Sequence, residues 1–89
     1  MLQKMQACFR ADKVLYSKHA KDEMENEELG QIREREVHEA VLSGKIIESY
    51  PEDEPYPSCL IYGTTFETRP IHVVGAYAAE SDMVIMMDS

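Results

Sequence analysis

The sequence predicts a single α+β domain over residues 1–89, with two or three N-terminal helices packed on one face of a four-stranded antiparallel sheet. Three observations lead to this prediction. Apolar residues recur at helical spacing over about residues 2–43. β-Branched and aromatic residues dominate about residues 45–87, where prolines, glycines and short polar stretches separate the apolar runs. Short connections between such runs join antiparallel neighbours.

The first two helices are expected over residues 1–11 and 18–29. The first has three apolar residues at helical spacing, namely Leu2, Met5 and Phe9. The second follows Ser17, whose hydroxyl can accept a hydrogen bond from a free amide of the first turn, and it is expected to end at Gly30. Between the two helices, residues 14–16 are predicted to be extended.

Five of the twelve residues of the predicted second helix are acidic. Its carboxylates are Asp22, Glu23, Glu25, Glu27 and Glu28. A helix spreads such side chains around its surface, so we expect a solvated face rather than a site for a metal ion or a cationic partner, which needs converging ligands. Ile32 then anchors the chain before a third helix, from about residue 33 or 34 to 43, which Gly44 ends.

Four strands are expected, over residues 45–50, 58–66, 71–78 and 83–87. Residues 58–66 carry apolar side chains on both alternating faces, which is typical of a central strand. The apolar run at 83–87 is expected on a sheet edge, and an exposed apolar edge favours self-association through that strand.

Charge and cysteine usage limit the function classes. The net charge is −8, and residues 45–89 carry eight acidic side chains against two basic ones, Lys45 and Arg69. Such a surface disfavours nucleic-acid backbones, which bind through several Lys or Arg contacts. Cys8 and Cys59 form no C-x-x-C pair, and we expect buried thiols in a cytoplasmic protein, with an exposed reactive cysteine as the alternative. No secretion leader or membrane-spanning run is recognised, and no cofactor or metal motif.

Five blocks of the sequence resemble a known family. They are Ser17-Lys18-His19-Ala20, Glu34-Arg35-Glu36-Val37, the run from Ser43 to Tyr50, Pro57-Ser58-Cys59-Leu60, and Pro70-Ile71-His72-Val73-Val74. Their order and spacing are similar to those of domain-of-unknown-function family 4258. The resemblance implies a prokaryotic domain with a fold similar to RelE-like toxins, whose relatives are suspected toxin halves of toxin–antitoxin pairs. The sequence departs from the family pattern after Val84, where the pattern has a tyrosine, so a site that uses this tyrosine is expected to be incomplete.

The resemblance points to five candidate residues of a metal-independent ribonuclease: His19, Arg35, Arg69, His72 and Tyr77. A histidine would act as general base or acid on the ribose 2′-hydroxyl, and the arginines would bind phosphate. Four of these residues also have a structural interpretation. His19 would bond a backbone carbonyl, His72 would be a half-buried core histidine, Arg35 would pair with nearby carboxylates, and Tyr77 would be a strand aromatic with its hydroxyl in water.

Three classes of function remain open. The first, which the acidic surface favours, is a non-catalytic interaction module that binds an antitoxin-like protein or a second copy of itself. The second is a ribonuclease toxin of a toxin–antitoxin pair, which would bind RNA. The third is a small-molecule enzyme, for which no phosphate loop or nucleophile–base spacing is present. A basic cleft containing His19 or His72 would favour the ribonuclease, whereas scattered basic residues would favour the interaction module.

Overall fold

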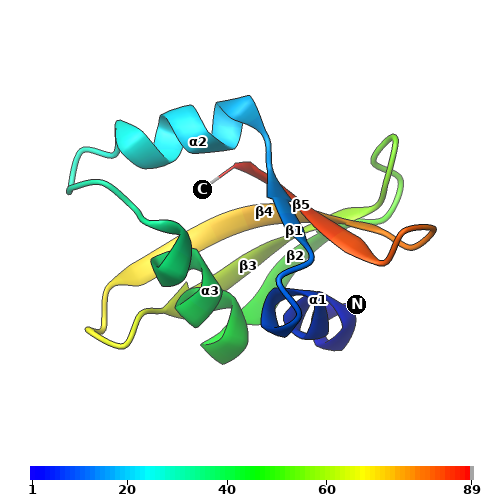
Figure 1. Cartoon of the computed structure of the whole chain (residues 1–89), viewed down its shortest axis with the longest axis horizontal. Coiled ribbons are helices and arrows are strands. Elements are labelled where there is room, and N and C mark those ends of the chain that lie inside the picture. Colours follow the sequence, from blue (N-terminus) through cyan, green and yellow to red (C-terminus); the bar gives the residue numbers. More distant parts are fainter. Residues whose placement is uncertain (89) are drawn as a thin grey trace.

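The computed structural model describes residues 1–88 and shows three helices and five strands (Figure 1). The sequence ends at Ser89, which lies outside the described residues. The elements follow in the order α1 (Leu2–Arg10), β1 (Val14–Tyr16), α2 (Lys18–Glu25), α3 (Glu34–Ser43), β2 (Lys45–Tyr50), β3 (Ser58–Thr64), β4 (Pro70–Ala78) and β5 (Met83–Asp88). The α+β class and the order of its helices and later strands agree with the sequence-based prediction.

The sheet corrects the prediction of four antiparallel strands. Its order is β1-β5-β4-β3-β2, and β1 pairs with β5 in parallel. The fifth strand is the segment Val14–Tyr16, which was predicted to be extended but not to join the sheet. Its partner strand lies about seventy residues later in the chain, and no local sequence pattern predicts a parallel pairing between segments so far apart.

The position of β5 also corrects the expected edge. The strand lies between β1 and β4, with Leu15 opposite Ile85 on one side and Tyr77 opposite Val84 on the other. The edges of the sheet are therefore β1 and β2. Pairing of a second copy with β5 would first require β1 to leave it, so the edge premise for self-association through this strand no longer holds.

The structure confirms two of the predicted helix boundaries, the start of α2 and the end of α3. The Ser17 hydroxyl accepts a hydrogen bond from the Ala20 amide at 3.1 Å, and α3 ends before Gly44. However, α2 ends at Glu25 rather than at residue 29. At this end both the backbone amide and the side chain of Asn26 donate to the Asp22 carbonyl, at 3.1 Å and 2.8 Å. Ile32 anchors the following loop as predicted, since its side chain is buried and its amide donates to the Met24 carbonyl at 2.8 Å.

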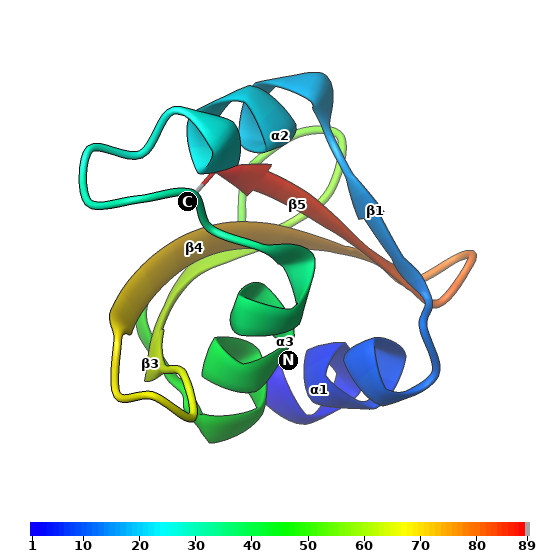
Figure 2. The same cartoon turned by 60° about the vertical axis from the view of Figure 1, so that its left-hand side comes forward.

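The core lies between the helices and the concave face of the curved sheet (Figure 2). One cluster of buried side chains joins all three helices to β3, β4 and β5, among them Met5, Met24, Val37, Ile61 and Val84. In Figure 2, α1 and α3 lie inside the curve of β3 and β4, while α2 lies against β5. None of the described helices has the length and hydrophobicity to span a bilayer.

Glycine sets how closely α3 approaches β3. An ideal Cβ on Gly63 would lie 1.9 Å from the Ala40 carbonyl oxygen of α3. No side chain fits at this distance, so the helix packs directly against the strand backbone. This close approach places the polar side of α3 beside β1 and the turn between β3 and β4.

Candidate functional site

The two candidate histidines make separate contacts. His19 is exposed on α2, and its Nε2 lies 2.7 Å from Glu23 Oε1, so it contacts a carboxylate rather than the expected backbone carbonyl. His72 is exposed rather than half-buried, and its ring centroid lies 4.7 Å from that of Tyr62 on the neighbouring strand. No contact among the described residues joins the two histidines.

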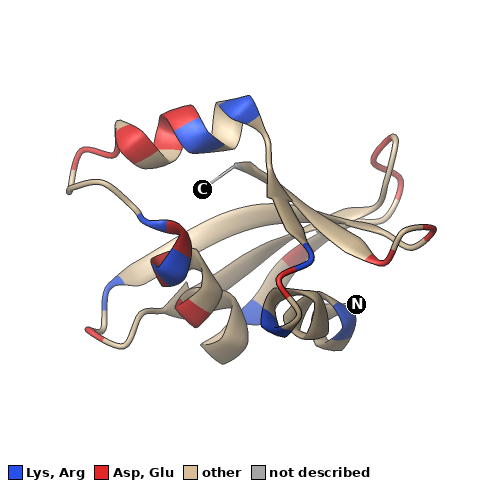
Figure 3. Ribbon diagram, in the orientation of Figure 1, with Lys and Arg blue, Asp and Glu red and all other residues tan. Residues whose placement is uncertain are grey.

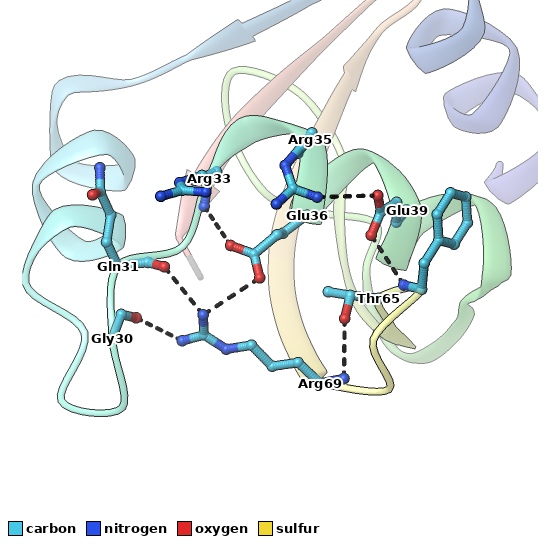
Figure 4. A network of polar contacts seen from close by, with 9 residues as sticks. Gly30, Gln31, Arg33, Arg35, Glu36, Glu39, Thr65 and Arg69 are labelled. Atoms are coloured by element: carbon cyan, nitrogen blue, oxygen red, sulfur yellow. Dashed lines mark hydrogen bonds and ion pairs between the residues drawn. The ribbon is translucent and has the colours of Figure 1, made fainter.

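Arg69 connects three segments of the chain (Figure 4). Its guanidinium donates to the carbonyls of Gly30 at 2.6 Å and Gln31 at 3.1 Å, and it lies 3.5 Å from Glu36 Oε2. Its backbone amide donates to the Thr65 hydroxyl at 3.0 Å. These contacts hold the β3–β4 turn to the loop between α2 and α3, so a phosphate at Arg69 would compete with them.

Arg35 and Glu39 form the one-turn ion pair that their spacing predicts. Arg35 Nη1 lies 3.7 Å from Glu39 Oε2 (Figure 4). Glu39 Oε1 also accepts a hydrogen bond from the Phe66 amide at 3.0 Å. Glu39 thus links α3 to the β3–β4 turn, and Arg35 belongs to the same polar surface.

Tyr77 is held by Asp82, in the turn before β5. Its hydroxyl donates to Asp82 Oδ1 at 2.6 Å, while Lys13 Nζ lies 3.0 Å from Oδ2. The hydrogen bond raises the pKa of Tyr77 to about 12 and is the first cause that lowers the pKa of Asp82 to about 2. Tyr77 is therefore a neutral phenol at physiological pH and cannot act there as a base.

A cleft of about 440 Å³ lies between α1, β1, α3 and the β3–β4 turn. Its apolar lining comes from Phe9, Val14, Tyr16, Leu42 and Phe66, and its polar lining from Asp12, Glu34, Arg35, His38 and Glu39. Of the five predicted site residues, only Arg35 lines this cleft. Clefts that combine apolar walls with a few polar groups are typical binding sites.

The electrostatics of the cleft are acidic. Burial raises the pKa of Tyr16 well above its ordinary range, and the nearby carboxylates of Glu34 and Asp12 raise it further. The His38 ring contacts Phe9 edge-on, with centroids 5.8 Å apart. Three carboxylates thus face one arginine, Arg35, that is already paired with Glu39.

The polar residues of α3 gave a partial signal for this cleft. Residues 34, 35, 38, 39 and 42 lie on one side of a helix, and the sequence predicted this helix with its correct end. The cleft itself also needs Asp12 and Tyr16 from the first sixteen residues and Phe66 from a turn. Their proximity depends on the unpredicted pairing of β1 with β5.

Metal and thiol chemistry gain no support from the described residues. Within residues 1–88, no three His, Cys, Asp or Glu side chains converge on a position where they could hold a metal ion. Cys8 and Cys59 are buried free thiols, which confirms the structural interpretation of both. Burial raises the pKa of each, so neither is an activated thiolate.

Basic side chains are scattered over the molecule. Figure 3 shows them on α1, on α2, around the start of α3 and singly elsewhere, interspersed with acidic residues. The acidic residues of α2 and of the turns form the larger groups in this view. The arrangement differs from the contiguous basic cleft expected of a ribonuclease.

Comparison with known proteins identifies one relationship. The family model described as Domain of unknown function (DUF4258) matches residues 16–86, which include every strand residue from Tyr16 to Met86. No curated protein matches the chain, and neither does any solved structure.

Proposed function

The chain belongs to the DUF4258 family, as the five sequence blocks indicated, and we propose that it is a protein-interaction module whose docking site is the cleft between α1, β1 and α3. The observation that carries the proposal is the composition of this cleft, which joins partly buried apolar side chains and the exposed Phe66 to an excess of carboxylates. Such a surface fits a protein segment with an apolar anchor and basic neighbours.

Phe66 is the strongest single feature of the proposed docking site. Its side chain is 84% exposed, although the Phe66 amide is fixed by Glu39. An exposed aromatic ring at the rim of a cleft, on a backbone that is already fixed, can cover an apolar group of a partner. The proposed partner is an antitoxin-like protein with a basic segment, met in the cytoplasm.

A ribonuclease of toxin type is the second candidate, because one observation favours it. His38, Tyr16 and Arg35 line the same cleft, and these residue types can perform metal-independent RNA cleavage. Two features count against it. The carboxylates of Asp12, Glu34 and Glu39 repel phosphate, and Arg35 is already engaged by Glu39.

Selection from a random peptide display library tests the proposal. Peptides enriched on the wild-type protein are measured against Phe66→Ser, which removes one wall of the cleft. Leu29→Ser is the matched control, since Leu29 is 87% exposed and lies outside the cleft. We expect Phe66→Ser to weaken binding about tenfold or more, as loss of an aromatic anchor does, and Leu29→Ser to leave it unchanged.

Two outcomes would overturn the proposal. One is the absence of any enriched peptide, and the other is binding that neither variant affects. Cleavage of added RNA by the purified protein, abolished in His38→Ala, would instead make the ribonuclease the better account of the cleft.

A further inference from the structure

The strand that borders the cleft, β1, is paired on one side only. The Val84 amide donates to the Lys13 carbonyl at 3.1 Å, and the Ser17 amide donates to the Met86 carbonyl at 3.0 Å. Backbone groups of successive residues in a strand point to opposite sides, so residues 13, 15 and 17 face β5. The amides and carbonyls of Val14 and Tyr16 face the other side, where no hydrogen bond to them occurs within residues 1–88.

The same two residues contribute their side chains to the cleft. Val14 and Tyr16 point from β1 toward the side that α3 covers, and both line the cleft wall. An extended segment placed along β1 would therefore meet unpaired backbone groups and, through alternate side chains, the apolar cleft. Both requirements of strand addition are met at one place.

Two carboxylates border this free edge. Asp12 lies just before β1, and Glu34 begins α3, and both line the cleft and lie near Tyr16. Neither takes part in an ion pair within the described residues, whereas Glu39 is paired with Arg35 and Asp82 with Lys13. The unpaired charge at the edge is thus negative and complements a basic segment.

We infer that β1 binds an extended, basic segment of a partner protein as a sixth strand, which places an apolar side chain in the cleft and Lys or Arg side chains beside Asp12 and Glu34. The inference rests on the proposed interaction function and specifies its partner. The other edge is a poorer acceptor, because a bulge between Ile46 and Glu48 interrupts the register of β2.

Two designed peptide libraries test the charge requirement. Both alternate apolar with charged positions, and the charged positions hold Lys or Arg in one library and Asp or Glu in the other. We expect binders from the basic library alone. The double variant Asp12→Asn, Glu34→Gln should weaken them about five- to tenfold, an effect that salt reduces. Glu52→Gln, Glu54→Gln removes the same charge from the exposed β2–β3 loop and should leave the affinity unchanged.

Amide hydrogen exchange tests the strand geometry. In the free protein, the Val14 and Tyr16 amides should exchange faster than the Leu15 amide, which faces β5. Bound basic peptide should slow exchange at Val14 and Tyr16 about tenfold or more. Leu15 is the internal control, because its hydrogen bond to β5 is present in both states.

The outcomes separate this inference from the proposed function. Peptides from the random library that depend on Phe66 but leave Val14 and Tyr16 unprotected would overturn strand addition and leave the docking cleft in place. Equal binding of acidic peptides would overturn the basic partner. If the random library yields binders but the basic library does not, only the inference fails. If neither the random library nor the two designed libraries yields a binder, the inference and the proposed function both fail.

Discussion

Asp82 shows how a single exposed residue joins three parts of the chain. Its carboxylate contacts Tyr77 from β4 and Lys13 before β1, and the Cys8 thiol of α1 lies 3.4 Å from its carbonyl oxygen. Asp12 and Asp82 both have a positive φ, of 58° and 51°, at the two turns that close this corner. Asp and Asn adopt this backbone conformation more readily than most residues. Asn is therefore a conservative test of the charge at position 82.

We predict that Asp82→Asn changes how stability depends on pH. The pKa of Asp82 is lowered from 3.8 to about 2 in the folded protein, so the carboxylate stabilises the fold above about pH 4. This contribution is lost as the pH falls from about 4 to about 2. Urea unfolding should show a variant that is less stable at pH 6 and that converges with the wild type near pH 2. A constant difference over this range would contradict the assignment.

Arg69 provides a second prediction for a single side chain. Arg69→Met removes charge-assisted hydrogen bonds to two carbonyls in a partly buried position, and we expect a loss of about 2 kcal/mol in the free energy of unfolding. Arg35→Met removes an ion pair that is more exposed and should cost about 0–1 kcal/mol. Urea unfolding of both variants measures the difference. Equal losses would show that Arg69 is not a structural link.

At the scale of elements, the contact between α3 and β3 is the least tolerant. Gly63→Ala places a methyl group against the backbone of Ala40, so helix and strand must separate, and we expect a loss of about 3 kcal/mol. Gly75→Ala is the matched control on β4, since its methyl group would meet only the flexible ends of Met5 and Met86. We expect about 1 kcal/mol there. A chemical denaturation series distinguishes the two, and a larger loss for Gly75→Ala would contradict this packing.

The elements that could be predicted from the sequence are those whose signals lie close together in the chain. The Ser17 cap, Gly44 and the β-branched run before Pro51 act through neighbours in the chain, and the structure confirms each. The prediction placed the end of α2 before Gly30 and did not consider Asn26, whose side chain donates to the Asp22 carbonyl where the helix ends. The pairing of β1 was missed because three residues carry no period, and the partner strand is remote in sequence.

At the scale of the whole molecule, the charge distribution separates the candidate functions. Within the described residues the basic side chains are scattered, and three of them, Lys13, Arg35 and Arg69, form ion pairs with carboxylates (Figure 3). The candidate site could not be predicted as a unit. It combines α1, β1, α3 and the turn that carries Phe66, and only the folded chain brings these together.

Growth of a bacterial host during induced expression provides a prediction at this scale. We expect unimpaired growth for the wild type and for the His19→Ala, His72→Ala double variant, because the two histidines share no site. Immunoblots confirm that both proteins accumulate. Growth arrest by the wild type that the double variant relieves would contradict the interaction account and favour the ribonuclease.

The central claim is that the cleft between α1, β1 and α3 binds a segment of a protein partner. The most direct test is a two-dimensional NMR titration of the labelled protein with a peptide selected on it. The account predicts that the largest shift changes occur at the amides of Val14, Tyr16, His38 and Phe66, which line the cleft. Changes that instead centre on Tyr62 and His72, on the convex face of the sheet, would contradict it.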